Sequence, residues 1–388
     1  MIPSPASLVE NGPTPIAAYI HVPFCSQRCG YCNFSLLANR SDLYERYVDA
    51  IERELWLLEV PRPVKTIFYG GGTPSILPEQ IAEKLFNLIR HWLPLEDGGE
   101  CSLEANPIDV TDKKLKFWKS EGINRLSIGG QSFQENKLKV LERDHNPQEL
   151  INAIERAITY IPRVSLDLIF AAPGETLQDW LSDLDQVLKL GLEHVSTYGL
   201  TFEKGSAFWG RLQRNDLKRA SEDLELEMYT RAIDILTQGG LEHYEVSNFA
   251  KPGQACQHNQ SYWNGDRWWA FGPSAASYLG KHRSVNHRGT LNYLRRVEAG
   301  ETALIECEEL SIDQQWRERF VFGMRQMQGV PWFQWRSSVP EDTRADIDAA
   351  MKDHFDRGWL EVNGEYVRLT RAGLVVSDGL WSSYFNPS

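Results

Sequence analysis

The sequence predicts an α/β protein in which helices cover a parallel sheet. Six times in a row, between residues 15 and 240, a short apolar run is followed by an amphipathic helical pattern. Such alternation is typical of parallel strands joined by helical crossovers. Right-handed crossovers leave either an open doubly wound sheet or a barrel. Polar and glycine-rich segments follow the strands, and in both arrangements functional side chains gather at the carboxyl ends of the strands.

The six units can be followed along the chain. The predicted strands are 15–22, 66–72, 101–107, 125–133, 163–174 and 194–201. The predicted helices that follow them are 41–59, 77–93, 111–122, 146–161, 176–192 and 221–240. We expect Ser41 to cap the first helix and Pro78 to lie in the first turn of the second. Gly122 is a stop signal for the third helix.

The alternation stops after about residue 240. Residues 242–253 predict one more strand and a turn, and 256–278 are rich in aromatic residues, Gly and Asn without a clear period. Helices are predicted over 309–329 and 342–359, followed by a hairpin over 360–370 around an Asn-Gly turn. We interpret this last region as a small C-terminal α+β, winged-helix-like domain that serves as a packing or lid module. The predicted parts are a tail over 1–14, a core over 15–243, an extension over 244–308 and the C-terminal domain over 309–388.

The composition is that of an ordinary globular protein. The 388 residues are 42% hydrophobic and 24% charged, with a net charge of −12. Acidity of this size argues against broad nucleic-acid binding. No apolar run is long enough for a transmembrane helix, and the first residues lack the pattern of a signal peptide. We therefore expect a cytoplasmic protein that could contact a membrane through its partners.

The stretch HVPFCSQRCGYCNF, residues 21–34, holds Cys25, Cys29 and Cys32 in a C-x3-C-x2-C pattern. In a cytosolic protein such a group indicates a metal or redox site. Three thiolates can hold three corners of a four-iron cluster and leave one iron open to another ligand. The alternative is a zinc site with His21 as fourth ligand. Tyr31, just before the last Cys, could shield a cluster or stack on an adenine.

This cysteine pattern, with an aromatic residue before its last Cys, resembles the radical S-adenosylmethionine (SAM) enzymes. The resemblance implies a [4Fe–4S] cluster on Cys25, Cys29 and Cys32, with SAM on the open iron. The lead-in YIHVPFC, which starts at Tyr19, resembles the coproporphyrinogen-dehydrogenase-like group, and the resemblance covers almost the whole chain. It implies a partial (β/α)6, TIM-like radical SAM barrel with a HemN-like C-terminal domain.

The same resemblance implies which residues contact SAM. The glycines of GGGTP let the backbone approach a ligand closely. Glu104 suits the ammonium group or the ribose, Arg143 the carboxylate by its fork geometry, and Asp167 the ribose hydroxyls. By carry-over from the group, the expected SAM contacts are Tyr19, Tyr31, Gly71, Gly72, Thr73, Glu104, Gln131, Arg143, Asp167 and Gly199.

Two activities share this scaffold, and three features favour one of them. Dehydrogenases of the group place a fourth Cys where this chain has Phe34, and they carry a longer N-terminal extension than the 24 residues before Cys25. HNQSYW, residues 258–263, resembles a region of the HemW-type heme chaperones. There His258 would contact heme, covered by Tyr262 and Trp263.

The thiol of Cys256 ranks below His258 as a heme ligand. Cys101 and Cys307 lie outside any motif and are interpreted as ordinary buried thiols.

The resemblance is therefore closest to the HemW-type chaperones. It implies a protein that binds heme and transfers it to respiratory hemoproteins while carrying SAM and a [4Fe–4S] cluster. The alternative is an oxygen-independent coproporphyrinogen III dehydrogenase, an oxidoreductase of heme biosynthesis, and whether SAM is turned over stays open. A purely structural iron–sulfur protein is a third, less favoured reading. Expected partners are heme, a low-potential donor such as flavodoxin or ferredoxin, and a second copy in a homodimer.

Overall fold

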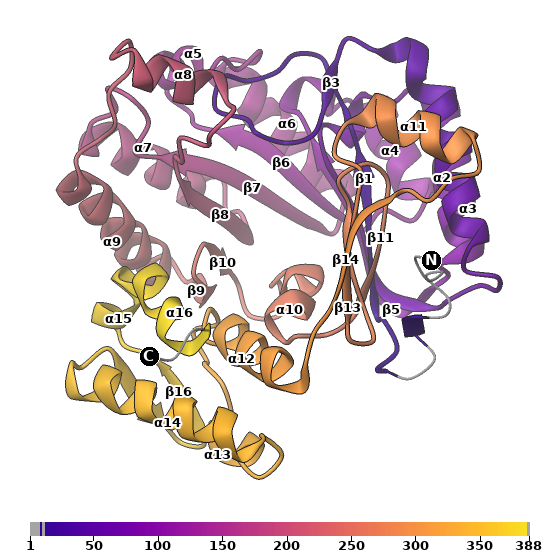
Figure 1. Cartoon of the computed structure of the whole chain (residues 1–388). Helices are drawn as coiled ribbons and strands as arrows, with labels where there is room; N and C mark the ends of the chain where they lie inside the picture. Colours follow the sequence, from indigo (N-terminus) through magenta and orange to yellow (C-terminus); the bar gives the residue numbers. More distant parts are fainter. Residues whose placement is uncertain (1–7, 10–11, 386–388) are drawn as a thin grey trace.

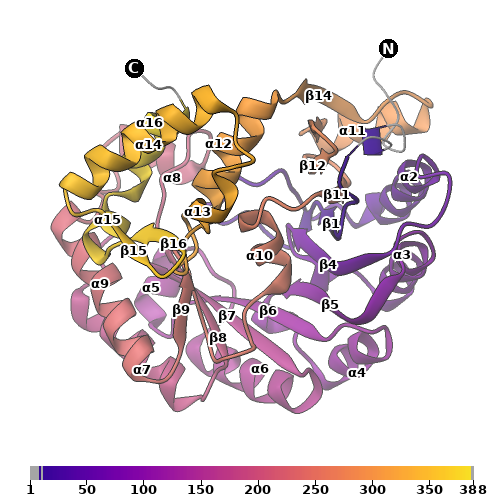
Figure 2. The same cartoon turned by 90° about the horizontal axis from the view of Figure 1, so that it is seen from below.

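The computed structural model describes residues 8–9 and 12–385, so most of the expected tail over 1–14 lies outside the described residues. Six parallel strands pair side by side in chain order and curve into an incomplete barrel (Figures 1 and 2). They are β1 (Ala17–Val22), β4 (Val64–Gly71), β5 (Leu95–Ala105), β6 (Arg125–Gln131), β7 (Arg163–Phe170) and β8 (His194–Gly199). The prediction of a partial (β/α)6 barrel is confirmed.

Helices cover the outer face of this sheet, as the alternation predicts (Figure 2). They are α2 (Tyr44–Trp56), α3 (Glu79–Trp92), α4 (Asp112–Ser120), α6 (Pro147–Tyr160), α7 (Leu177–Lys189) and α9 (Glu222–Gln238). Alternate strand residues such as Ile67, Leu103 and Ile128 are buried in the core between sheet and helices. Because side chains alternate across a strand, their neighbours, such as Phe68 and Glu104, face the barrel interior.

Of the three predicted helix-end signals, Gly122 agrees with the structure, since it follows the end of α4 at φ of +89°. Asn146 and Thr176 form capping boxes at the starts of α6 and α7. The prediction that Ser41 caps the first helix is wrong, because a short 3-10 helix, η1 (Ser41–Leu43), precedes α2. Pro78 stands immediately before α3, in the capping position rather than in the first turn.

The sheet continues beyond the barrel at both edges. Strand β8 pairs with the antiparallel β10 (Asn248–Ala250), which pairs with β9 (Glu242–Glu245). Strand β1 pairs in parallel with β11 (Trp268–Phe271), and three antiparallel strands follow, β12 (Ala276–Leu279), β13 (His282–Asn286) and β14 (Leu304–Glu309). The segment 242–253, predicted as one strand and a turn, is thus two strands. A regular helix, α10 (Gln257–Trp263), forms where no period was apparent.

Helix α10 lies across the lower end of the barrel (Figure 2). The Glu100 carboxylate accepts hydrogen bonds from the amides of Gln257 and His258, at 3.2 and 3.1 Å. These bonds fasten the start of the helix to β5. The helix therefore closes the side of the lumen opposite the carboxyl ends of the strands.

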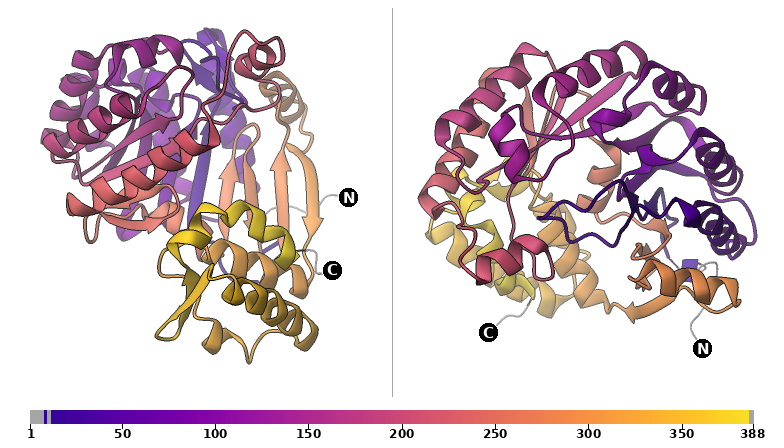
Figure 3. Two further views of the ribbon diagram at one scale, coloured as in Figure 1. Left: turned by 90° about the vertical axis from the view of Figure 1, so that its left-hand side faces the viewer. Right: turned by 90° about the horizontal axis from the view of Figure 1, so that it is seen from above.

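The C-terminal region lies below the barrel, as the left view of Figure 3 shows. Its elements are α12 (Ile312–Gly323), α13 (Trp332–Trp335), α14 (Glu341–Asp356), β15 (Leu360–Asn363), β16 (Tyr366–Leu369), α15 (Arg371–Val375) and α16 (Ser377–Phe385). Phe320, Trp332 and Tyr384 are buried in a core of its own. Arg371 pairs with Asp234 of α9 at 2.6 Å, which ties this region to the barrel.

Short elements complete the chain around the barrel. They are β2 (Phe24–Cys25), β3 (Leu37–Ala38), η2 (Pro74–Ile76), η3 (Pro107–Asp109), α5 (Glu135–Val140), α8 (Ala207–Gln213) and α11 (Thr290–Glu298). Across the part of the chain that the structure describes, no helix has the length and apolar character needed to cross a membrane.

Candidate functional site

One cavity of about 570 Å³ lies at the carboxyl ends of the barrel strands. It is lined by the three motif cysteines and by nine of the ten residues expected to contact SAM. These nine are Tyr31, Gly71, Gly72, Thr73, Glu104, Gln131, Arg143, Asp167 and Gly199. The tenth, Tyr19, lines an adjoining cavity deeper in the lumen. The fold thus gathers residues that are far apart in sequence, as parallel strands ending at one edge require.

The cysteine loop brings three free thiols to this cavity. Cys25 Sγ lies 3.2 Å from Thr73 Oγ1, and Arg143 Nη1 donates to Cys29 Sγ at 3.4 Å. Burial raises the pKa of the Cys25 thiol to about 11 and also raises that of Cys32. Metal ligation requires thiolates, so binding of a metal cluster would release protons from these groups. The donor set fits a cluster held at three corners.

His21 does not serve as a zinc ligand in this arrangement. Its Nε2 lies 2.9 Å from the carbonyl oxygen of Ser35, and its Nδ1 lies 3.2 Å from the Tyr19 hydroxyl. Both ring nitrogens are therefore engaged. Within residues 8–9 and 12–385, no three His, Cys, Asp or Glu side chains converge on a site for a single metal ion. The zinc alternative has no support from this geometry.

The glycine segment makes room beside the cysteines. Gly71 has φ of +107°, and a Cβ there would lie 2.5 Å from the His21 ring. A Cβ on Gly72 would lie 2.6 Å from the carbonyl oxygen of Phe24. Only glycine fits either position, so the backbone can approach a ligand in the cavity closely.

Arg143 forms another part of the cavity wall. Its Nη2 donates to the carbonyl oxygen of Gly129 at 2.8 Å and lies 3.4 Å from Asn106 Oδ1. Its Nε is buried, without an acceptor among the described residues. A guanidinium with an unused donor fits a carboxylate ligand such as the methionine part of SAM.

Two carboxylates that line the same cavity form no ion pair among the described residues. Glu104 Oε2 accepts from the amide of Gly71 at 3.0 Å, and Ser127 Oγ lies 3.1 Å from both oxygens of Asp167. Burial, together with the charge of Asp167, raises the pKa of Glu104 to about 8, and burial raises that of Asp167. No Lys or Arg in the described part of the chain pairs with either group. A cationic ligand such as SAM would supply the missing positive charge.

Replacing Glu104 with Gln is expected to stabilise the ligand-free protein while weakening SAM binding. The raised pKa means that wild-type stability falls as the pH rises from about 4.5 toward 8, because the unfolded chain ionises first. Glu104→Gln removes this loss, so its melting temperature should exceed that of wild type at pH 8 and match it near pH 4.5. Loss of a charged acceptor should weaken SAM binding roughly tenfold or more.

Thermal melts across this pH range and SAM titrations would check both effects. Glu96→Gln, an exposed position on the same strand β5, is the matched control. An unchanged pH profile in Glu104→Gln would contradict the assignment of the raised pKa.

Some residues that line the cavity were not predicted from the sequence. They are Asn106, Ser127, Gly129, Asp144 and Tyr198. The two-residue period of a strand could have found Ser127 and Gly129, which precede Gln131 on the same face. Asp144 accepts a hydrogen bond from the side chain of Asn106 at 3.1 Å. This contact joins two loops, and no local sequence pattern predicts it.

His258 lies on the other side of the lumen, in helix α10. It is 1% exposed, and its Nδ1 and Nε2 lie 2.8 Å from Thr66 Oγ1 and 2.7 Å from the Tyr262 hydroxyl. In this conformation both nitrogens are engaged. Burial also lowers the pKa of His258 to about 3, so the ring is neutral.

The expectation that Tyr262 and Trp263 together cover a heme bound at His258 is not met in this conformation. Trp263 packs against Phe322 and Arg325, away from His258, so it does not join Tyr262 in covering one ligand face. The reason is that α10 is a helix, which turns adjacent side chains apart. The Cys256 thiol is buried and donates to Glu100 at 3.4 Å.

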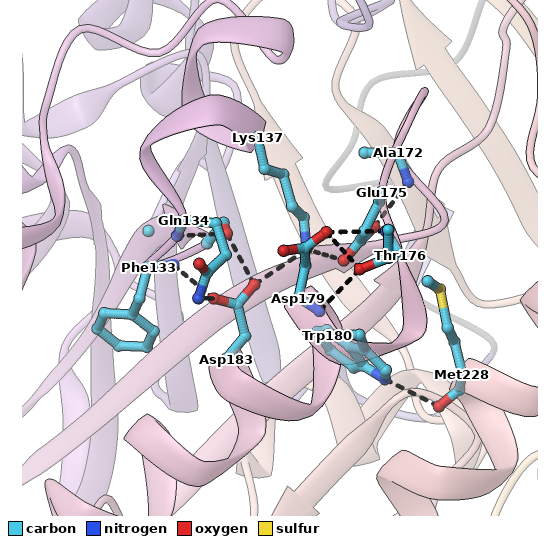
Figure 4. A network of polar contacts seen from close by, with 12 residues as sticks. Phe133, Gln134, Lys137, Ala172, Glu175, Thr176, Asp179, Trp180, Asp183 and Met228 are labelled. Carbon is cyan, nitrogen blue, oxygen red and sulfur yellow. Dashed lines mark hydrogen bonds and ion pairs between the residues drawn. The ribbon is translucent and has the colours of Figure 1, made fainter.

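A buried charge network supports the loops at the upper end of the barrel (Figure 4). Lys137 of α5 pairs with Glu175 in the loop after β7 and with Asp183 of α7, the latter at 3.0 Å. Asp183 also accepts from Ser132 Oγ at 2.7 Å and from the Phe133 amide at 2.8 Å. These bonds hold the segment that follows Gln131, itself at φ of +66° in the cavity wall.

The fold and the site define the class of protein. The family model of the radical SAM superfamily matches residues 19–187, and that of the HemN C-terminal domain matches residues 310–376. The solved structure of coproporphyrinogen III oxidase (HemN) from Escherichia coli has the same fold, with a TM-score of 0.86 and 20% identity. It covers 98% of this chain and 92% of that one. The protein is thus a radical SAM protein, a class defined by SAM and a [4Fe–4S] cluster.

Relatives that match over nearly the whole chain narrow this class to one family. The heme chaperone HemW of Bacillus subtilis is 32% identical over 95% of this chain and 98% of its own length. HemW of Synechocystis is 35% identical over 90% of this chain and 87% of its own. The mouse mitochondrial radical S-adenosyl methionine domain-containing protein 1 is 30% identical over 97% of this chain and 88% of its own length. The chain belongs to the HemW family.

Proposed function

We propose that this protein is a heme chaperone that binds heme and transfers it to hemoproteins. The observation that carries the proposal is the match to HemW of Bacillus subtilis, which extends over nearly the full length of both chains. The cysteine loop agrees, because Phe34 stands where a dehydrogenase of this group would place a fourth Cys. Its side chain is 64% exposed and lines the rim of the cavity.

The cavity at the strand ends would hold the cluster and SAM. Cys25, Cys29 and Cys32 would ligate three irons, and Arg143 would bind the SAM carboxylate. Glu104 and Asp167 would balance its positive charge and bind the ribose. When bound, the pair supplies a one-electron reductive cleavage of the sulfonium. The side chains of this chain would hold and orient the ligand.

For heme, His258 is the proposed ligand. Axial ligation needs a nitrogen lone pair. The hydrogen bond between His258 Nε2 and the Tyr262 hydroxyl would have to open first. Heme binding would then involve a displacement of α10, the helix that closes the lumen.

Further partners follow from this role. The proposed recipients are respiratory hemoproteins, and the proposed electron donor is a flavodoxin or ferredoxin, since reduction of SAM needs a low-potential cluster. A homodimer and a cytoplasmic location, with membrane contact only through partners, complete the proposal.

His258→Ala is expected to weaken heme binding roughly tenfold or more, because loss of a ligand should cost at least as much as loss of a group that supports one. Tyr262→Phe should strengthen it, because the ring nitrogen loses its competing hydroxyl. Heme titrations followed at the Soret band would measure both, with the exposed His91→Ala as control. Wild-type affinity in His258→Ala would remove this ligand assignment.

One pair of assays tests the function itself. Anaerobically reconstituted protein is titrated with heme and, separately, incubated with coproporphyrinogen III, SAM and a strong reductant. The proposal predicts saturable heme binding without decarboxylated product. Absence of heme binding would overturn it, and formation of product would support the dehydrogenase alternative.

A further inference from the structure

A second cavity of about 220 Å³ lies in the lumen beneath the one that holds the cysteines. The two share four lining residues, so they follow each other along the barrel interior. These are Glu104, Ser127, Asp167 and Tyr198. Helix α10 contributes His258 and Tyr262 to the lower cavity and closes it from below. Neither the cluster nor the proposed SAM contacts account for its floor.

Two buried donors on this floor have no acceptor. Arg125 is 2% exposed and Ser102 is fully buried. Arg125 Nη2 and Ser102 Oγ lack a hydrogen-bond partner among the described residues. The residues are direct neighbours in the pairing of β5 with β6, and both line the cavity. Buried polar groups in folded proteins almost always have a hydrogen-bond partner, so two adjacent unpaired ones indicate a place for a ligand.

Arg125 shares its nearest carboxylate with a second guanidinium, although the carboxylates Glu104 and Asp167 also line the cavity. Glu100 lies between Arg125 and Arg163, at 3.7 and 3.6 Å, so one carboxylate faces two guanidinium groups. The Glu100 oxygens also accept from the amides at the start of α10. Asp167 is hydrogen-bonded by the hydroxyls of Ser127 and Ser196. It forms no ion pair with Arg125 in the described residues.

We propose that this lower cavity binds a small carboxylate, either a free molecule or the arm of a larger ligand, on Arg125 Nη2 and Ser102 Oγ. Two carboxylate oxygens match two adjacent donors. The cavity of about 220 Å³ is several times larger than the roughly 30 Å³ that one water occupies in the liquid, so it has room for a ligand of a few heavy atoms. A propionate group has this size and charge, and heme carries two of them. The proposal concerns a site separate from the His258 nitrogen and does not require that His258 ligate heme.

Calorimetric titration of the SAM-loaded holoprotein with sodium propionate tests the proposal. Wild type should bind propionate saturably. Ser102→Ala should weaken binding about tenfold, since one hydrogen bond to a charged group is lost. Arg125→Lys should weaken it more, because a lysine loses the fork. Ser277→Ala, a buried serine in β12 outside the lumen, should bind as wild type does.

Absence of saturable binding to wild type would overturn the proposal. So would wild-type affinity in Ser102→Ala, a substitution that removes no hydrogen bond found in the fold and so is not expected to unfold the protein. Heme and heme dimethyl ester distinguish the two sources. If Ser102→Ala weakens binding of heme but not of its ester, the ligand is a heme propionate. If it weakens only propionate, the ligand is a free small carboxylate.

These readings separate the two proposals. Failure of the heme-chaperone role would appear as absence of any heme binding. Failure of the carboxylate site would appear in the propionate titration, whether or not heme binds.

Discussion

Cys29→Ala is expected to abolish the iron–sulfur absorbance of anaerobically reconstituted protein. Cys29 is one of three thiols on a single loop at the cavity. Removing it leaves two protein ligands for a cluster that needs three. The side chain is only partly buried and accepts one weak hydrogen bond, from Arg143, so the fold should persist. Visible absorption and iron content after reconstitution measure the loss.

Cys307→Ala is the matched control for this experiment. The prediction that Cys307 is buried is wrong, because it is an exposed free thiol on β14, a strand whose residues are mostly exposed, and it lies outside the cavity. Its removal should leave cluster content unchanged. A full cluster in Cys29→Ala would show that the ligands have been assigned wrongly, and unchanged circular dichroism would show that the loss is not caused by unfolding.

Lys137→Met is expected to destabilise the protein by about 3–5 kcal/mol, the effect of removing one partner from a buried ion pair. Glu175 and Asp183 would remain as buried carboxylates without their shared cation. Burial already raises the pKa of Glu175, and the ammonium group of Lys137 opposes that rise. Urea denaturation followed by circular dichroism gives the change in free energy of unfolding.

The neighbouring substitution Lys139→Met is the matched control, because it removes the same charge from α5 outside the buried network. Lys139 forms an exposed pair with Glu135 at 2.6 Å, and such a pair contributes about 0.3–0.5 kcal/mol. Because the network holds the segment after Gln131, Lys137→Met should also weaken SAM binding. A free-energy change below about 1 kcal/mol would contradict the network's role in stability.

Much of the upper cavity could be predicted from sequence, because its residues carry local signals. The C-x3-C-x2-C loop is a contiguous pattern, and GGGTP contains the glycines that the crowded backbone at Gly71 and Gly72 requires. Glu104, Gln131 and Asp167 stand at or near the ends of strands. Once the β/α alternation is recognised, parallel strands bring those ends to one edge. Nine expected SAM contacts therefore lie in one cavity.

The lower end of the lumen could not be predicted in the same way. No period marks α10 in the sequence, because it is short and its capping carboxylate, Glu100, comes from a strand more than 150 residues earlier. The orientation of Trp263 away from Tyr262 follows from that helix. Likewise, the pairing of Ser102 with Arg125 depends on strand register, which the strand patterns alone do not reveal.

The sequence alone was enough to identify the class of protein. Alternating strands and helices, three spaced cysteines, and polar groups after successive strands are local features, so they can be recognised without knowing which distant residues meet. Folding in three dimensions decided the rest. It curved the sheet into a partial barrel, engaged both nitrogens of His258, and joined Lys137 to two carboxylates 38 and 46 residues away. The physical reason is that hydrogen bonds, burial and charge pairing depend on which residues meet across strands and loops, and those meetings are non-local.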